Sequence, residues 1–243
     1  MAELERLIEA RFRDVAYFPV GGYFTTRQAA DFLLEVQPMM PRHGRCLDLG
    51  CGPRQLWREV LEAYGVAWFG ADVFPPTTAI PEYRQVIDNR LDFPDEFFDA
   101  VCSIDVVEHL TQPDTMMSET ARVLKTDGVV WGTCAFWQME HDSYFHMTHR
   151  GLRLLLERHG FEVVKLAPSR HSGLVLTSQR LLAGDGRVHT ESFRSHMTSG
   201  AKCALNLLPF FICNLLELAR RSLRHHDPFA DCASLYFIAR KVH

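Results

Sequence analysis

Residues 46–53 have the sequence Cys-Leu-Asp-Leu-Gly-Cys-Gly-Pro. The first four predict a buried strand that contains an acid, Asp48, and two glycines follow at the C-terminal end of that strand. A buried carboxylate without a partner is costly, so Asp48 is expected to serve a specific contact there. Gly50 and Gly52 let the backbone approach a ligand closely, in the crevice where open parallel sheets bind their ligands. The stretch therefore predicts a strand followed by a ligand-binding loop.

The segments around this stretch alternate between short apolar runs and helical patterns. Further strands are predicted over residues 67–71, 83–87, 100–104, 129–134, 161–166 and 233–239, and helices over residues 2–12, 26–36, 56–64, 115–124 and 150–158. Strands that alternate with helices imply a mainly parallel sheet covered on both faces. The predicted fold class is α/β, a doubly wound, Rossmann-like sheet of seven strands.

The alternation divides the chain into four predicted parts. They are an N-terminal helical cap (1–36), an α/β core (37–168), a helical insertion or lid (169–230) and a last strand that completes the core sheet (231–243). Residues 203–216 carry no charge, but this stretch is shorter than the ~20 apolar residues that a membrane span needs. We expect a helical cap over the core there, with a lid for an apolar substrate or a membrane-surface face as the alternatives.

Composition limits the classes of function. The chain has 243 residues, 47% of them hydrophobic and 23% charged, which is typical of a globular protein. With a net charge of −4 and no run of Lys and Arg, nucleic acid is not an expected partner. No secretory signal is apparent, and the seven cysteines lack Cys-x-x-Cys or zinc-ribbon spacing, so free thiols in the cytoplasm are expected. The expected assembly is a monomer or a homodimer.

The spacing around the glycine loop favours a nucleoside site. A nicotinamide-dinucleotide fingerprint would need a third glycine where this chain has Gln55, which disfavours a dehydrogenase. Asp72 ends the second predicted strand, about 20 residues after the glycines, where a carboxylate accepts hydrogen bonds from ribose hydroxyls. The alternative is that Gly50 and Gly52 form an ordinary tight turn and that Asp72 caps a helix.

Four stretches carry a resemblance to a known family. They are residues 47–52, Asp72, residues 91–101 and residues 103–110. In these stretches the chain resembles the class I S-adenosylmethionine-dependent methyltransferases, and specifically the small-molecule enzymes similar to the ubiquinone and menaquinone methyltransferases. The resemblance covers about residues 40–166 and implies S-adenosylmethionine as the cofactor.

The resemblance also implies roles for individual residues. Asp48, Gly50 and Gly52 would line the methionine part of the cofactor, Asp72 would hold the ribose, and Asp88 or Asn89 would contact the adenine. The complete set of expected cofactor-binding residues is Asp48, Gly50, Cys51, Gly52, Asp72, Val73, Asp88, Asn89 and Asp105.

The acceptor side is predicted at the same edge of the sheet. Residues 136–149 combine aromatic rings, histidines and acids after the fifth strand. Methyl transfer needs a base only when the acceptor is a hydroxyl or similar acid, and His109, His141 and His146 are the candidates, although a histidine can equally cap or orient backbone. Residues expected to contact the substrate are Glu108, Trp137 and Tyr144. The histidine spacing matches no standard zinc pattern, so no metal is expected.

Two functions remain open from the sequence. The first is methyl transfer to oxygen, nitrogen or carbon of a small molecule, with lipid, quinone, sugar and natural-product intermediates as the candidate acceptors. The alternative is a non-methylating protein of the same fold, either a cofactor-binding partner subunit or an enzyme that uses the nucleoside site for another transfer. Intact Asp48, Gly50, Gly52 and Asp72 favour a working cofactor site in either case.

Overall fold

The structure is a computed structural model that describes residues 33–53, 55, 57–76, 78–137, 142–169 and 232–242, with Leu215, Asp227 and Phe229. The predicted cap (1–36) and the predicted insertion (169–230) lie almost wholly outside the described residues. Both therefore stay predictions.

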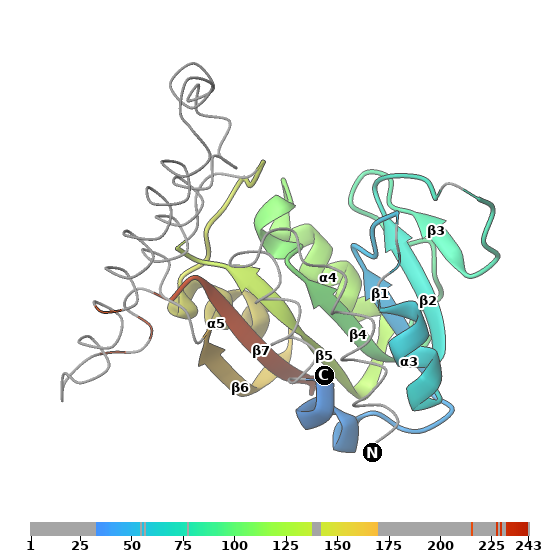
Figure 1. Cartoon of the computed structure of the whole chain (residues 1–243), viewed down its shortest axis with the longest axis horizontal. Coiled ribbons are helices and arrows are strands. Elements are labelled where there is room, and N and C mark those ends of the chain that lie inside the picture. Colours follow the sequence, from blue (N-terminus) through green and yellow to red (C-terminus); the bar gives the residue numbers. More distant parts are fainter. Residues whose placement is uncertain are drawn as a thin grey trace, which may run out of the picture.

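Helices and strands alternate along the described chain. In order they are η2 (Gln37–Met39), β1 (Arg45–Leu49), α3 (Arg58–Tyr64), β2 (Ala67–Asp72), β3 (Tyr83–Gln85), β4 (Phe98–Ile104), η3 (Val107–His109), α4 (Pro113–Val123), β5 (Leu124–Ala135), α5 (His149–Arg158), β6 (Phe161–Pro168) and β7 (Ser234–Lys241). The strands form one sheet in the order β3-β2-β1-β4-β5-β7-β6 (Figure 1). Only β7 runs antiparallel to its neighbours, β5 and β6. The predicted fold class, a mainly parallel seven-stranded sheet, is confirmed.

Each face of the sheet is covered by its own apolar core. Successive residues of a strand point to opposite faces, so Cys46 of β1 packs with Val60 and Leu61 of α3 on one face. Leu47 of β1 packs on the other face, with side chains of α4 and α5. Asp48 shares the α3 face with Cys46, so the helix start that follows the glycine loop lies on the same side as this acid.

Strand β5 begins earlier than the predicted start at residue 129. It follows α4 directly at Leu124, which pairs with Phe98 at the start of β4, and the register then shifts before Ala100. The residues after Leu124 are polar, and Asp127 has a positive φ (63°), as in a turn. The sequence pattern therefore did not predict a strand before residue 129.

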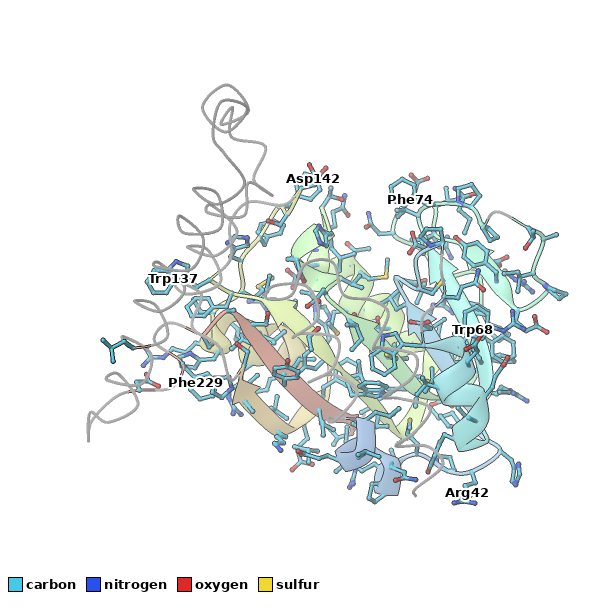
Figure 2. The ribbon with its side chains drawn as sticks, viewed as in Figure 1. Arg42, Trp68, Phe74, Trp137, Asp142 and Phe229 are labelled. Carbon is cyan, nitrogen blue, oxygen red and sulfur yellow. The ribbon has the colours of Figure 1, made fainter. Side chains whose placement is uncertain are left out.

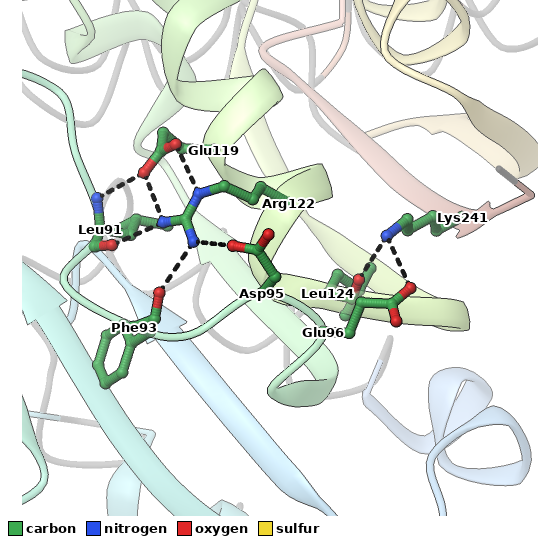
Figure 3. Close-up of polar contacts among 8 residues, drawn as sticks. All are labelled: Leu91, Phe93, Asp95, Glu96, Glu119, Arg122, Leu124 and Lys241. Carbon is green, nitrogen blue, oxygen red and sulfur yellow. Dashed lines mark hydrogen bonds and ion pairs between the residues drawn. The ribbon is translucent and has the colours of Figure 1, made fainter.

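An arginine on α4 fastens the loop that precedes β4 (Figure 3). Arg122 donates to the carbonyl oxygens of Leu91 (2.8 Å) and Phe93 (2.9 Å) and to the carboxylate of Asp95 (2.6 Å). Glu119, one helical turn earlier, accepts two hydrogen bonds from the same guanidinium and one from the Leu91 N–H. The loop is thus held by charged hydrogen bonds that also orient the arginine.

We expect Arg122→Met to lower the free energy of unfolding by about 2–3 kcal/mol, because it leaves loop carbonyls and Glu119 without their charged partner. Arg153→Met is the matched control, since Arg153 makes one exposed pair with Glu157 (3.4 Å) that is worth about 0.5 kcal/mol. Urea unfolding followed by circular dichroism measures both. Equal losses in the two variants would contradict the anchoring role of Arg122.

Candidate functional site

The loops that follow the parallel strands gather at one edge of the sheet. Strands β1, β2, β4 and β5 run in the same direction, so their carboxyl ends share that edge. Figure 2 shows Phe74, which follows β2, and Asp142, in the loop after β5, at the same edge, with Arg42 at the opposite one. The predicted cofactor and acceptor residues belong to these loops or to the strand ends next to them.

Asp48 is buried in the centre of the sheet and has a partner within the protein. Its side chain is 2% exposed, and the indole N–H of Trp68 donates to its Oδ2 over 3.1 Å. Burial, aided by the negative charge of Asp72, raises the pKa of Asp48 to about 7, while the indole hydrogen bond opposes this shift. The acid is therefore largely neutral below pH 7, and a cation placed beside it would favour its ionised form.

The glycine loop is tied to the end of β2. Gly50 N donates to Ala71 O (2.7 Å) and Gly52 N donates to Asp72 Oδ2 (2.8 Å). Gly50 and Gly52 have φ of 73° and 61°, a region that glycine adopts without strain. A Cβ on Gly50 would lie 2.3 Å from Val106 Cγ2, whereas a Cβ on Gly52 would meet no described atom within 4 Å. Gly50 is thus required by packing, and Gly52 faces open space.

Cys51 lies between these glycines with its side chain buried. Burial, with the charges of Asp48 and Asp72, raises the pKa of its thiol, so it packs as a small protonated side chain. All the cysteines in the described ranges are buried, namely Cys46, Cys51, Cys102, Cys134 and Cys232.

Asp72 joins the glycine loop to the segment after β2. Besides accepting from Gly52 N, its carboxylate accepts from Phe74 N through Oδ1 (3.0 Å). Each carboxylate oxygen has a second lone pair, so both can accept further hydrogen bonds from a ligand. The next two side chains, Val73 and Phe74, are exposed apolar groups. The end of β2 thus offers an acceptor pair beside an apolar surface.

Asp88 and Asn89 form a tight turn, which the sequence reasoning did not identify. Their φ angles are 51° and 56°, and Arg90 N donates to Ile87 O (2.9 Å) across the turn. Two successive positive φ angles are characteristic of type I′ turns, and Asp and Asn tolerate that region best after glycine. Because of this turn β3 ends at Gln85, before the predicted limit at residue 87. Adenine contact by either residue stays a prediction.

Asp105 ends β4 and fixes the direction of the chain beyond it. Its φ is 53°, its N–H donates to Thr133 O (3.1 Å), and its Oδ1 accepts from Thr133 Oγ1 (2.7 Å). The chain then turns into η3, and Val106 packs against Gly50. Asp105 therefore couples the end of β4 to β5 and lies beside the glycine loop through Val106.

Glu108 is completely buried, and its predicted contact with a substrate stays a prediction. Its Oε1 accepts from Ala135 N (3.1 Å), and its backbone oxygen accepts from Tyr144 N (2.7 Å) and Phe145 N (3.1 Å). The sequence signal was an acid near the end of a strand, and that signal cannot distinguish an exposed acid from one that turns inward.

Two of the three predicted base candidates lie in this region, and both are exposed. His109 Nδ1 lies 3.1 Å from Asp142 O, and His146 Nε2 lies 2.9 Å from Ser143 Oγ. His141 lies outside the described residues. Tyr144 is 65% exposed and Trp137 is 44% exposed, so the rings predicted to contact a substrate face solvent.

Within the described ranges, no group of three or more His, Cys, Asp or Glu side chains is arranged to hold a metal ion. Glu140 and His141 lie outside those ranges. No helix in the same part of the chain is both long and apolar enough to cross a membrane.

Comparison with known proteins assigns this arrangement to a family. Residues 22–166, more than half of the chain, match the family described as a methyltransferase domain. The chain belongs to this methyltransferase family. The predicted relation to the class I S-adenosylmethionine-dependent methyltransferases is therefore confirmed, and the matched segment includes the glycine loop, Asp72 and η3.

Similar proteins agree on the fold and differ in their reactions. The ubiquinone biosynthesis O-methyltransferase of Cereibacter sphaeroides is 30% identical over 120 residues, 44% of this chain and 48% of that protein. The match thus spans about half the length of this curated relative. Phosphoethanolamine N-methyltransferase 2 of Haemonchus contortus, solved with S-adenosyl-L-methionine, is 18% identical with a TM-score of 0.57, covering 98% of this chain and 56% of that one.

A further solved structure of the same fold carries a different name. The [4+2]-cyclase SpnF is 20% identical, with a TM-score of 0.57, over 98% of this chain and 94% of that chain. At these identities the structural likeness shows the fold alone. The reaction has to be argued from the site.

Proposed function

We propose that this methyltransferase-family chain transfers a methyl group from S-adenosylmethionine to a small-molecule acceptor. The observation that carries the proposal is the junction of the glycine loop with Asp72, where Gly52 N and Asp72 Oδ2 are 2.8 Å apart. At this junction the backbone of the glycine loop, which can approach a ligand closely, lies beside a carboxylate that can accept further hydrogen bonds. A ligand with a ribose and a cationic amino-acid part matches both Asp72 and the buried Asp48.

The proposed cofactor contacts follow the strand order. Asp48, Gly50 and Gly52, at the end of β1, would hold the methionine part, and Asp72 would accept hydrogen bonds from the ribose hydroxyls. Val73 and the turn at Asp88 and Asn89 would border the adenine. The remaining members of the proposed set are Cys51, which packs beneath the loop, and Asp105, which ends β4. When bound, S-adenosylmethionine supplies an electrophilic methyl group on a sulfonium sulfur.

The acceptor would approach from the loop after β5. The bound cofactor would supply its methyl group to an oxygen, nitrogen or carbon of the acceptor and would be released as S-adenosylhomocysteine. A hydroxyl acceptor must also lose a proton, for which the proposed bases are His109 of η3, His146 of the loop after β5, and His141, which lies outside the described residues. Trp137 and Tyr144 would form the pocket wall. Lipid, quinone, sugar and natural-product intermediates, in the cytoplasm, are the proposed acceptor classes.

The alternative function is cofactor binding without methyl transfer, as a partner subunit or in another reaction. This alternative is retained because a protein of similar fold is named as a [4+2]-cyclase. Labelled S-adenosylmethionine discriminates the two functions. Transfer of the labelled methyl group to any member of a panel of phenols, amines and carboxylic acids supports the enzyme, and binding without transfer to any of them favours the alternative.

We expect Asp72→Ala to weaken binding of S-adenosylmethionine and S-adenosylhomocysteine at least tenfold, about 1.4 kcal/mol of lost hydrogen bonding. Calorimetric titration measures the two affinities. The exposed Asp92→Ala is the control for loss of one negative charge and should leave both affinities within about twofold. Absence of binding to the unaltered protein would overturn the proposed function.

A further inference from the structure

Strand β5 extends beyond the end of its neighbour β4. Ile104, the last residue of β4, pairs with Thr133, whereas β5 continues to Ala135. Phe136 N–H points to the side of β7 and donates to the oxygen of Ala233, the residue before that strand. Successive residues of a strand direct their hydrogen-bonding groups to opposite sides, so the N–H and C=O of Ala135 point toward the side of β4, where no strand residue remains.

Two groups from other segments take the place of the missing strand. Ala135 is fully buried, and a buried N–H or C=O without a partner is strongly unfavourable. The Ala135 N–H donates to Glu108 Oε1 (3.1 Å), and the Ala135 C=O accepts from Met147 N (3.2 Å). The backbone oxygen of Glu108 in turn accepts from Tyr144 N (2.7 Å). These bonds close a ring that joins η3, the end of β5 and the loop of residues 142–147.

A carboxyl group at the position of Glu108 is energetically unfavourable because of its burial. Its side chain is completely buried, the Cys134 thiol hydrogen-bonds its carboxyl, and its Oε2 has no N–H or O–H partner within the described part of the chain. Burial and the negative charge of Asp105 raise the pKa of Glu108 well above its ordinary value, which favours the neutral carboxyl. A neutral carboxyl still offers a carbonyl-like acceptor to Ala135 N. An apolar residue would pack there at lower cost but would leave that N–H unpaired.

We propose that Glu108 is a positioning residue whose side chain continues the hydrogen bonding of β4 and thereby holds the loop of residues 142–147 at the end of β5. The same ring places Asp142 O against His109 Nδ1 (3.1 Å), so it aligns the two segments that carry His109 and His146. The catalytic consequence rests on the proposed function, whereas the positioning role stands on the geometry alone.

Hydrogen exchange of the full chain, read by mass spectrometry on a peptide spanning residues 142–148, tests the positioning role. Glu108→Met keeps the length of the side chain and removes the acceptor, and it should speed exchange of this peptide at least about tenfold. Glu108→Gln restores a carbonyl acceptor and should stay within about twofold of the unaltered protein. If Glu108→Met does not fold, Glu108→Ala serves the same comparison.

A control separates local loosening from general loss of stability. Leu61→Ala removes a fully buried side chain of α3 from the core on the opposite face of the sheet, at a cost of about 2–4 kcal/mol. It should leave exchange of residues 142–148 within about twofold under native conditions. Unchanged exchange in Glu108→Met, or equal acceleration in Glu108→Gln and Glu108→Met, would overturn the proposal.

Binding and turnover separate this proposal from the proposed function. Glu108→Met should keep its affinity for S-adenosylhomocysteine within about threefold, because the cofactor loop is not part of the ring. With an acceptor identified in the panel, the kcat/KM of Glu108→Met should be at least tenfold lower than that of the unaltered protein. The kcat/KM of Glu108→Gln should be close to that of the unaltered protein. If the unaltered protein binds no S-adenosylhomocysteine, the proposed function fails, and the exchange experiment still decides the role of Glu108.

Discussion

Asp48→Asn is expected to stabilise the ligand-free protein at pH 8 and to weaken S-adenosylmethionine binding at least a hundredfold. The two effects share one cause, since a buried carboxylate is unfavourable without a cation and favourable beside one. In the proposed cofactor site, Asp48 faces the cationic amino-acid part of the ligand. Loss of that charge pairing corresponds to about 2.7 kcal/mol. Calorimetric titration at pH 8 measures the affinity.

The gain in stability should depend on pH. The pKa of Asp48 is about 7 in the folded chain, against an ordinary value of 3.8. Between these values the folded state holds a proton that the unfolded state has lost, so the free energy of unfolding falls as pH rises from about 4 to 7. Asparagine removes this penalty, and its advantage should grow over that interval to a plateau on the order of 4 kcal/mol above pH 7, since each pKa unit corresponds to about 1.4 kcal/mol. Urea unfolding at a series of pH values measures it.

Asp99→Asn is the control, because its expected change in the free energy of unfolding has the opposite sign. Asp99 accepts from Lys125 Nζ (2.6 Å) and Arg45 N (2.8 Å), and these contacts outweigh its burial and lower its pKa. Its ionised form therefore stabilises the fold above the ordinary pKa, and Asp99→Asn should destabilise the protein at neutral pH, with the loss disappearing in acid.

Proton release gives an independent test of Asp48. If binding ionises this acid, the measured binding enthalpy at pH 6 should differ between buffers of different ionisation enthalpy, and the difference should vanish in Asp48→Asn. Affinity of Asp48→Asn equal to that of the unaltered protein would show that this acid does not face the cation.

Sequence reasoning succeeded for the sheet because its evidence is repetitive. Each strand is a short apolar run, and the acid and glycines of residues 48–52 could be placed at the end of one such run. The partner of Asp48 could not be predicted in this way. Trp68 lies in another strand, and only the register that sets Cys46 beside Trp68 brings its indole onto the same face.

The acceptor side was harder to predict because its residues are placed by side-chain direction. Glu108 and His109 are adjacent in the sequence, yet one is fully buried and the other is exposed. The difference arises from η3, a short helix that turns Glu108 toward the end of β5. Likewise, the positive φ angles of Asp88 and Asn89 reveal a turn that residue type alone does not distinguish from a binding pair.

Gly132→Ala is expected to have the largest effect on folding, a loss of more than about 4 kcal/mol or no soluble folded protein. Gly132 lies in β5 opposite Ser103 of β4. A Cβ there would lie 1.7 Å from Ser103 O and 2.6 Å from Ser103 C, and both obstructing atoms are backbone. A glycine within a strand marks such a close approach, and relief requires the two strands to separate. Urea unfolding of the soluble fraction measures the loss.

Gly151→Ala is the matched control for this substitution. Its Cβ would meet nothing closer than Thr148 Oγ1 at 3.4 Å, and alanine favours the helix, so stability should be unchanged or rise by up to about 1 kcal/mol. Ser103 is followed by Ile104 and Asp105, so a β4 displaced by Gly132→Ala would also move Val106 away from Gly50. Any folded Gly132→Ala protein should therefore bind S-adenosylmethionine poorly as well. Unfolding at the same urea concentration as the unaltered protein would show that these strands can separate without cost.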